Sequence, residues 1–99
     1  GGTTLIRLNT LLLLKVKETI MNEEVLAKII ERGSYIWGKE PGELTAETTF
    51  EEVGAKSGHI SQITTFLEDE FDAEVPYIGF KKCKTLGEAA AYVADLLDE

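Results

Sequence analysis

Apolar residues recur at helical spacing in the middle of the chain, directly after a glycine-bearing loop. They stand at i, i+3, i+7 and i+11, which is one face of a helix. These residues are Ile60, Ile63, Leu67 and Phe71. The spacing predicts a helix over residues 57–71, with Ser57 where an N-cap belongs and with Gly58 and His59 opening the first turn.

A second helix is indicated before this loop. Asn22 is a suitable N-cap for it, and the helical pattern continues to Trp37 before Gly38 and Pro41 end it. Its apolar stripe consists of Val25, Leu26, Ile29 and Ile30.

The C-terminal helix is marked by a capping box, which Thr85 and Glu88 form at its start. Its buried side is expected to consist of Leu86, Ala89, Ala90, Val93, Leu96 and Leu97. A short helical turn from Tyr77 to Phe80 is expected just before it, because Pro76 stops the preceding helix from continuing.

A long connection over residues 38–56 separates the first two of these helices. Its only apolar anchors are Leu44, Phe50 and Val53. Loops of this length in a compact domain are uncommon and are usually functional. No stretch alternates convincingly as a strand would. The pattern therefore predicts an all-α fold, a small four-helix bundle with three main helices, one short helix and a long first loop.

Residues 1–20 differ from the rest of the chain. Their apolar run is too short to span a bilayer, which requires about 20 apolar residues. Their charged residues are Arg7, Lys15, Lys17 and Glu18. The segment thus has a net charge of +2. Since the whole chain has a net charge of −8, residues 21–99 have a net charge of −10. We expect residues 1–20 to be a non-native or disordered extension and residues 21–99 to be the folded domain, with a genuine amphipathic extension as the alternative.

The chain as a whole is acidic, with an isoelectric point of about 4.6. Hydrophobic residues make up 43% of it and charged residues 28%, which indicates a globular domain and not a disordered chain. An acidic surface argues against nucleic acid and anionic membranes as partners and favours basic protein surfaces. The single cysteine, Cys83, allows no internal disulfide and is expected to pack in the core of a cytoplasmic protein.

Ser57 is the residue to which the pattern assigns chemistry. A helix N-terminus has unpaired N–H groups and a partial positive charge, so a serine hydroxyl there is well placed to carry a phosphodiester. The alternative is that Ser57 only caps the helix. A hydrolase pair of Ser57 and His59 is excluded because residues two apart on a helix do not face each other. The chain also lacks the glycine spacing of a serine hydrolase or a P-loop and the loop pattern of a calcium site, so we expect no metal.

Over residues 22–97 the ordered set of motifs resembles the acyl carrier protein family. That family has a Phe, a Leu-Gly, an Asp-Ser-Leu that opens its second helix, a Glu-Glu-Phe that ends it, and an Ile-Pro step. The corresponding residues here are Phe50, Val53-Gly54, Lys56-Ser57-Gly58, Glu68-Asp69-Glu70-Phe71 and Val75-Pro76. The spacings from Ser57 to Phe71, from there to Pro76, and from Pro76 to Leu86 match the family without a gap.

The resemblance implies a carrier and not an enzyme. A phosphopantetheinyl transferase would move 4′-phosphopantetheine from coenzyme A onto Ser57, and the thiol of this arm would hold an acyl group as a thioester for fatty acid, polyketide or related biosynthesis. The bundle interior would shelter the acyl chain among Ile60, Ile63, Phe66, Leu67, Tyr92 and Val93. Acyl-handling enzymes with basic patches would dock transiently on this monomeric carrier, on a surface formed by Lys56, Glu68, Asp69 and Glu70.

Two departures from the family pattern flank Ser57. Lys56 stands where the family has Asp, which reverses a charge, and Gly58 stands where it has Leu, which removes an apolar side chain. These departures support an alternative function, a carrier-like interaction module that is never modified and docks through the helix over residues 57–71.

Overall fold

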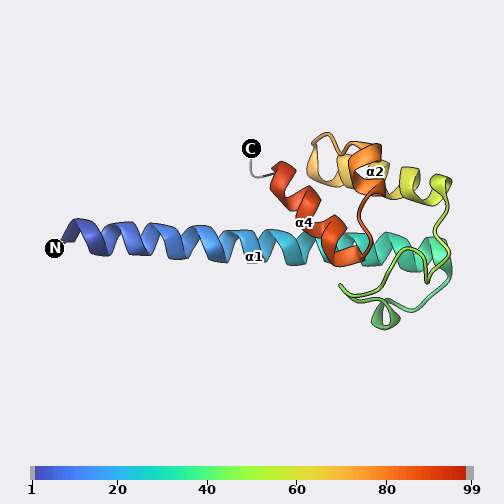
Figure 1. Ribbon diagram of the computed structural model, residues 1–99, viewed down its shortest axis with the longest axis horizontal. Helices are drawn as coiled ribbons and strands as arrows, with labels where there is room; N and C mark the ends of the chain where they lie inside the picture. The colour runs from blue at the N-terminus through green and yellow to red at the C-terminus, as the bar shows by residue number, and fades with distance from the viewer. Residues whose placement is uncertain (1, 98–99) are drawn as a thin grey trace.

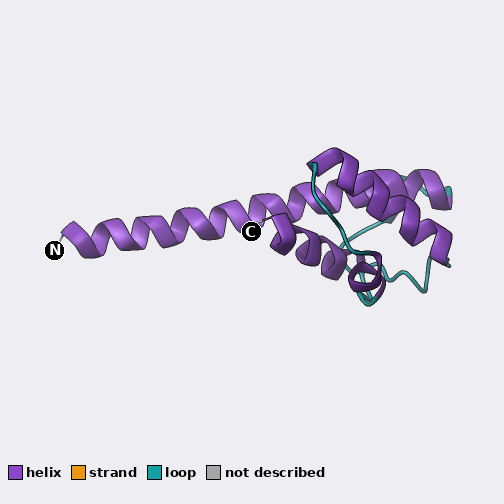
Figure 2. Ribbon diagram, turned by 90° about the horizontal axis from the view of Figure 1, so that it is seen from above, coloured by secondary structure: helices purple, strands orange, loops and turns teal. Residues whose placement is uncertain are grey.

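The computed structural model describes the backbone of residues 2–97 and the side chains of residues 11–97. Its longest element is helix α1 (Gly2–Trp37), which runs unbroken for 36 residues. A helix rises about 1.5 Å per residue, so α1 alone accounts for the 54 Å length of the molecule. In Figures 1 and 2 the N-terminal half of α1 stands clear of the other helices.

The prediction that the first helix begins at Asn22 is wrong, because Asn22 lies exposed inside α1. Residues 3–32 contain neither glycine nor proline and are rich in Leu, Lys and Glu, so nothing in this stretch stops a helix from continuing. Residues 11–20 are all exposed, so the bundle does not bury them. The boundary at Met21 and the non-native origin of the extension remain predictions.

The domain itself is an all-α bundle, as the pattern predicts. Helices α2 (Ser57–Phe71) and α4 (Leu86–Leu97) pack on the C-terminal half of α1, and the short α3 (Tyr77–Lys81) contacts both of them. Figure 1 shows α4 crossing beside α1, with α2 lying above the C-terminal end of α1. Within residues 2–97 no strand forms, and the only β-type pairing is an isolated bridge between Thr49 and Thr85.

One hydrophobic core unites the predicted apolar stripes. Its members are Val25, Ile29, Leu44, Phe50, Ile60, Ile63, Leu67, Val75, Phe80, Leu86, Ala89, Ala90, Val93 and Ala94. Helices α1, α2 and α4 each contribute residues three or four positions apart, because one stripe of a surface helix faces the core, and α3 contributes Phe80. Cys83, predicted to be a core residue, is only partly buried at the edge of this cluster.

The long loop over residues 38–56 contains one short 3₁₀ helix, η1 (Pro41–Glu43). Backbone hydrogen bonds tie the rest of the loop to the start of α4. Phe50 N–H donates to the Lys84 carbonyl (3.0 Å), and Leu86 N–H donates to the Thr48 carbonyl (2.9 Å). Leu44 and Phe50 are buried as predicted, so the loop is held at both its middle and its end. This arrangement fixes the position at which α2 begins.

Candidate functional site

The site is built around Ser57 at the start of α2. The structure corrects the predicted cap by one residue. Lys56 is the N-cap, with an extended backbone (φ −108°, ψ 168°), and Ser57 is the first helical residue. The Lys56 carbonyl accepts the first intrahelical bond, from Ile60 N–H at 3.1 Å. The Ser57 side chain is exposed, so an enzyme can reach its hydroxyl.

Beside the Ser57 hydroxyl lie the N–H groups of the first turn of α2. No hydrogen bond between described residues uses the N–H groups of Ser57, Gly58 or His59. Such groups at a helix start carry the positive end of the helix dipole and bind anions. The geometry therefore provides what a phosphate on Ser57 requires.

His59 receives two hydrogen bonds on a single ring nitrogen. Its Nδ1 accepts from the Lys56 backbone N–H at 3.1 Å and from the Trp37 indole N–H at 3.2 Å. A lysine side chain has only donors, so Lys56 cannot cap the helix through its own side chain. His59 thus supplies one half of a capping arrangement, and it joins the start of α2 to the end of α1. Neither contact was predicted from the sequence.

The two departures from the family motif both lie on the surface. Lys56 and Gly58 are exposed. A Cβ added at Gly58 would meet no atom within 4 Å, and the backbone there does not have a positive φ. A leucine at position 58 would therefore face a partner and not the bundle. Neither departure disturbs the fold, and both change what a partner would meet around Ser57.

The predicted acidic docking surface is partly used inside the molecule. Glu68 is half-buried, and its carboxylate accepts the Val75 N–H at 2.9 Å, which fastens the loop after α2. Glu70 lies 3.7 Å from the Lys28 ammonium of α1. Asp69 is exposed and makes no hydrogen bond or ion pair with another described residue. Of the three acids, Asp69 is therefore the one whose carboxylate is free of contacts with other described residues.

The six residues expected to shelter an acyl chain do not all lie together. Ile60, Ile63, Leu67 and Val93 are buried in the common core. Phe66 and Tyr92 lie at its edges, and each lines a separate surface groove. The two aromatic rings thus pack against the same core as the other four residues but line separate grooves, and a common acyl pocket of all six remains a prediction.

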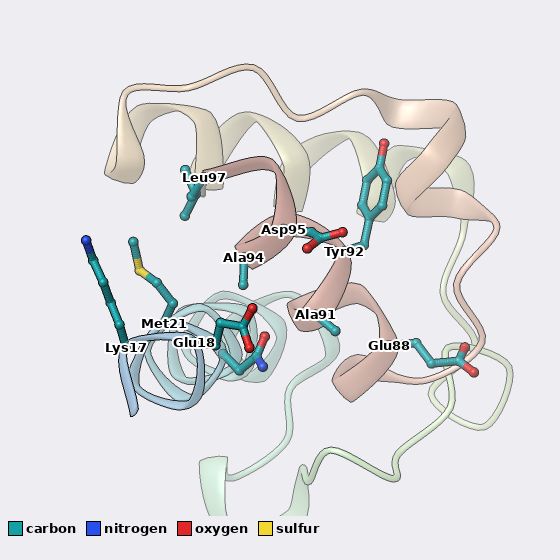
Figure 3. A pocket seen from close by; sticks show the side chains of 10 residues that line it. Lys17, Glu18, Met21, Glu88, Ala91, Tyr92, Ala94, Asp95 and Leu97 are labelled. Atoms are coloured by element: carbon teal, nitrogen blue, oxygen red, sulfur yellow. The ribbon is translucent and has the colours of Figure 1, made fainter. Parts of the chain in front are cut away.

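The larger groove, of about 670 Å³, lies between α1 and α4. Figure 3 shows Lys17, Glu18 and Met21 on the α1 side, with Tyr92 pointing away from them. A Cβ on Gly79 would collide with the Tyr92 hydroxyl, so glycine is required there in α3. The second groove, of about 630 Å³, lies beside α2 and is lined by Ser61, Gln62, Thr65, Phe66 and Arg32 among others. The Arg32 guanidinium lies 5.7 Å from the centre of the Phe66 ring.

The environment of Cys83 shifts the pKa of its thiol. Burial raises the pKa of its thiol above the ordinary 9.0, and the Glu88 carboxylate adds to the shift. The thiol contacts the Gly79 carbonyl oxygen at 3.7 Å. A reactive thiol would require the opposite shift, so Cys83 is a structural residue.

Two other features are absent from the described part of the chain. It contains no group of three or more His, Cys, Asp or Glu side chains arranged to hold a metal ion. None of its helices is both long enough and apolar enough to cross a membrane.

Comparison with known proteins gives relatives of one kind. The chain is 32% identical over 72 residues to an acyl carrier protein of Exiguobacterium sp. (strain ATCC BAA-1283 / AT1b), a match that covers 72% of the chain and 91% of the relative. It is 55% identical over 38 residues to the acyl carrier protein of Lactococcus lactis subsp. cremoris (strain MG1363), covering 38% of the chain and 52% of the relative.

A third relative is longer than the matched region. It is the meromycolate extension acyl carrier protein of Mycobacterium bovis (strain ATCC BAA-935 / AF2122/97), 28% identical over 81 residues, which are 81% of the chain and 70% of the relative. No family model matches the chain, and no solved structure matches it. The four-helix architecture, the exposed serine at the start of α2 and the Exiguobacterium match over nine-tenths of that relative agree. This chain belongs to the acyl carrier protein family, whose members are carriers and not enzymes.

Proposed function

We propose that this protein carries acyl groups as thioesters on a 4′-phosphopantetheine arm attached to the Ser57 hydroxyl. The observation that carries the proposal is the exposed Ser57 side chain at the first position of α2, beside N–H groups that no described residue uses. A phosphodiester on Ser57 would accept hydrogen bonds from these groups, and its charge would lie at the positive end of the helix dipole.

The attachment is a phosphoryl transfer from coenzyme A. The Ser57 oxygen forms a bond to the phosphorus that bears the pantetheine, and the bond from that phosphorus to the bridging oxygen of the diphosphate breaks. Adenosine 3′,5′-bisphosphate leaves, and the hydroxyl proton passes to a base on the transferase. This chain contributes position and electrostatics only, because the acceptor nitrogen of its single histidine is already occupied by two N–H groups.

The other serines are less suited to carry the arm. Ser34 lies in α1, where its hydroxyl donates to the Glu31 carbonyl at 2.9 Å. Ser61 lies one turn into α2, beyond the N–H groups that remain open. Ser57 is therefore the acceptor that we propose.

We further propose that the acyl cargo lies against the α2 side of the bundle core and that partner enzymes read the exposed α2 surface. Asp69 and Lys56 are the charged residues best placed for this contact, because Glu68 and Glu70 also bind within the molecule. One relative is named for meromycolate extension. We propose fatty acid, polyketide or related biosynthesis in the cytoplasm as the setting, with the carrier acting as a monomer.

The test uses coenzyme A and a broad-specificity phosphopantetheinyl transferase. The wild-type protein should gain the mass of one phosphopantetheine, and Ser57→Ala should gain none. Ser61→Ala is the matched control, and it should be modified like the wild type. The double variant Lys56→Asp with Gly58→Leu should be modified faster, because it restores an acidic charge and an apolar side chain at exposed positions.

A second function, that of an unmodified interaction module, is favoured by one observation. The two departures from the family motif lie exposed on either side of Ser57, where a transferase would bind. Under that function the wild type would stay unmodified while the double variant accepts the arm. If neither protein accepts it, Ser57 is only part of a helix start and the carrier function on Ser57 is wrong.

A further inference from the structure

We infer that His59 and Trp37 form a latch that positions Ser57 for modification. The latch consists of the two hydrogen bonds that converge on His59 Nδ1, from the Trp37 indole and from the Lys56 backbone. The inference rests on the proposed function, since it concerns how the acceptor serine is presented. His59 and Trp37 act as positioning residues, and neither is a catalytic residue.

The two hydrogen bonds determine the tautomer of the His59 ring. Both donors point at Nδ1, so this nitrogen must carry a lone pair, and the neutral ring then has its proton on Nε2. The contact with Trp37 is also an edge-on aromatic contact, with ring centres 6.4 Å apart and planes 83° apart. The ring is therefore held at its Nδ1 edge by donors from two different elements.

The Trp37 ring is itself held firmly at the end of α1. It lies over Gly33, one turn earlier, where an added Cβ would come within 2.5 Å of the ring. On another side it contacts the ring of Phe50 with centres 6.3 Å apart, and that ring contacts Phe80 in turn. The indole N–H is thus a donor fixed on the longest helix and in the aromatic core.

The latch compensates for the lysine at the N-cap. Lys56 has no side-chain acceptor, so it cannot close the first turn of α2 in the usual way. His59 instead holds the Lys56 backbone from inside the helix. Ser57 lies between these two residues, so fixing the Lys56 backbone fixes the place at which the Ser57 side chain leaves the start of α2.

His59 itself does not face the modified oxygen. Successive residues of a helix are about 100° apart, so His59 lies about 200° around α2 from Ser57. Its effect must therefore pass through the Lys56 backbone. This separation leaves the N–H groups of the first turn open to a phosphate.

The experiment compares Trp37→Phe, His59→Ala and the double variant with the wild type. Trp37→Phe keeps an aromatic ring but removes the indole donor. We expect kcat/KM for modification by the transferase to fall about two- to tenfold in Trp37→Phe, which loses one hydrogen bond, and at least as much in His59→Ala, which loses both. The double variant should be no slower than His59→Ala, because both changes break one shared contact. The KM for coenzyme A should not change.

Controls separate positioning from stability. Tyr35→Phe, an exposed aromatic position on the same helix, should leave the rate unchanged. His59→Gln should restore part of the rate, since Gln at this position can accept the Lys56 N–H. In the unmodified protein, NMR should show the Nε2–H tautomer of His59 at mildly alkaline pH, and the Lys56 amide should exchange faster in His59→Ala. Rates are compared well below the melting temperature of each variant.

Three outcomes would overturn the inference. The first is a wild-type rate in both single variants. The second is faster exchange of the Lys56 amide without any change in the modification rate. The third is a double variant whose modification rate falls by the product of the fold-losses of the two single variants. If the wild type accepts no arm at all, the proposed function fails and the positioning role fails with it. The NMR readouts would still show separately whether the latch exists.

Discussion

The N-termini of α2 and α4 differ in how completely they are closed. At α4 the Thr85 hydroxyl accepts the Glu88 N–H at 3.0 Å, and the Glu88 carboxylate accepts the Thr85 N–H at 3.3 Å. At α2 only the N-cap N–H is satisfied, by the His59 ring.

The difference fits a stabilising role for the start of α4 and the attachment role that we propose for the start of α2. The closed start of α4 stabilises the bundle where the long loop returns to it. The partly open start of α2 leaves N–H groups beside an exposed serine, at a cost in stability that is typical of functional sites. Two things make the difference: the residue types at the N-cap and three residues later, and the loop carbonyls of Thr48 and Ala46, which accept the first two N–H groups of α4 at 2.9 and 2.8 Å.

Opening the start of α4 should have the largest effect on stability. The double variant Thr85→Ala with Glu88→Ala removes both halves of the capping box, and we expect the free energy of unfolding to fall by about 2 kcal/mol. Urea denaturation would measure this. Ser34→Ala, which removes an exposed hydroxyl within α1, should change stability by less than about 0.5 kcal/mol. An equally small loss in the double variant would show that the box does not stabilise α4.

Closing the start of α2 should have a smaller effect of opposite sign. Lys56→Asp places an acceptor at the N-cap and a negative charge at the positive end of the helix dipole. We expect a gain of about 1 kcal/mol, which for a domain of this size raises the melting temperature by about 4–8 °C. Lys56→Gln removes the positive charge, but Gln is not a preferred cap. This variant should therefore show only part of the gain in stability. A melting temperature that falls in Lys56→Asp would contradict the assignment of Lys56 as N-cap.

The smallest expected effect concerns pH and the closed start of α4. Burial raises the pKa of the Cys83 thiol, and the charge of Glu88 raises it further. Because the folded pKa lies above the unfolded one, this contribution to stability is present below pH 9 and is lost as pH rises through the folded pKa. The wild type should therefore lose slightly more stability on going to alkaline pH than Cys83→Ala.

Two variants separate the charge of Glu88 from its hydrogen bonds. Glu88→Gln keeps an acceptor for the capping box but removes the charge, so Cys83 should react faster with a disulfide reagent at mildly alkaline pH. Thr85→Ala breaks part of the box but keeps the charge, so the thiol should react as slowly as in the wild type. Equal rates in all three proteins would mean that burial alone raises the pKa.

Local patterns in the sequence were enough to predict most of the fold. The helix over residues 57–71 follows from apolar periodicity, and the Thr85–Glu88 box follows from residue spacing. Both depend on residues within a few positions of one another, which is the range over which sequence patterns carry information. The same local reasoning failed at Asn22, where a residue that can cap lies within a helix that nothing interrupts.

The details of the site depend on contacts between residues far apart in the chain. Trp37 donates to His59 across 22 positions, so Lys56 and not Ser57 becomes the N-cap without leaving its N–H unpaired. Glu68 turns toward the Val75 backbone, and Phe66 and Tyr92 line two separate grooves at the edge of the core. No periodicity encodes such contacts, because they arise only when the packed helices bring donors, acceptors and rings together. The sequence alone determined which serine starts α2, and the tertiary structure decided how that serine is held.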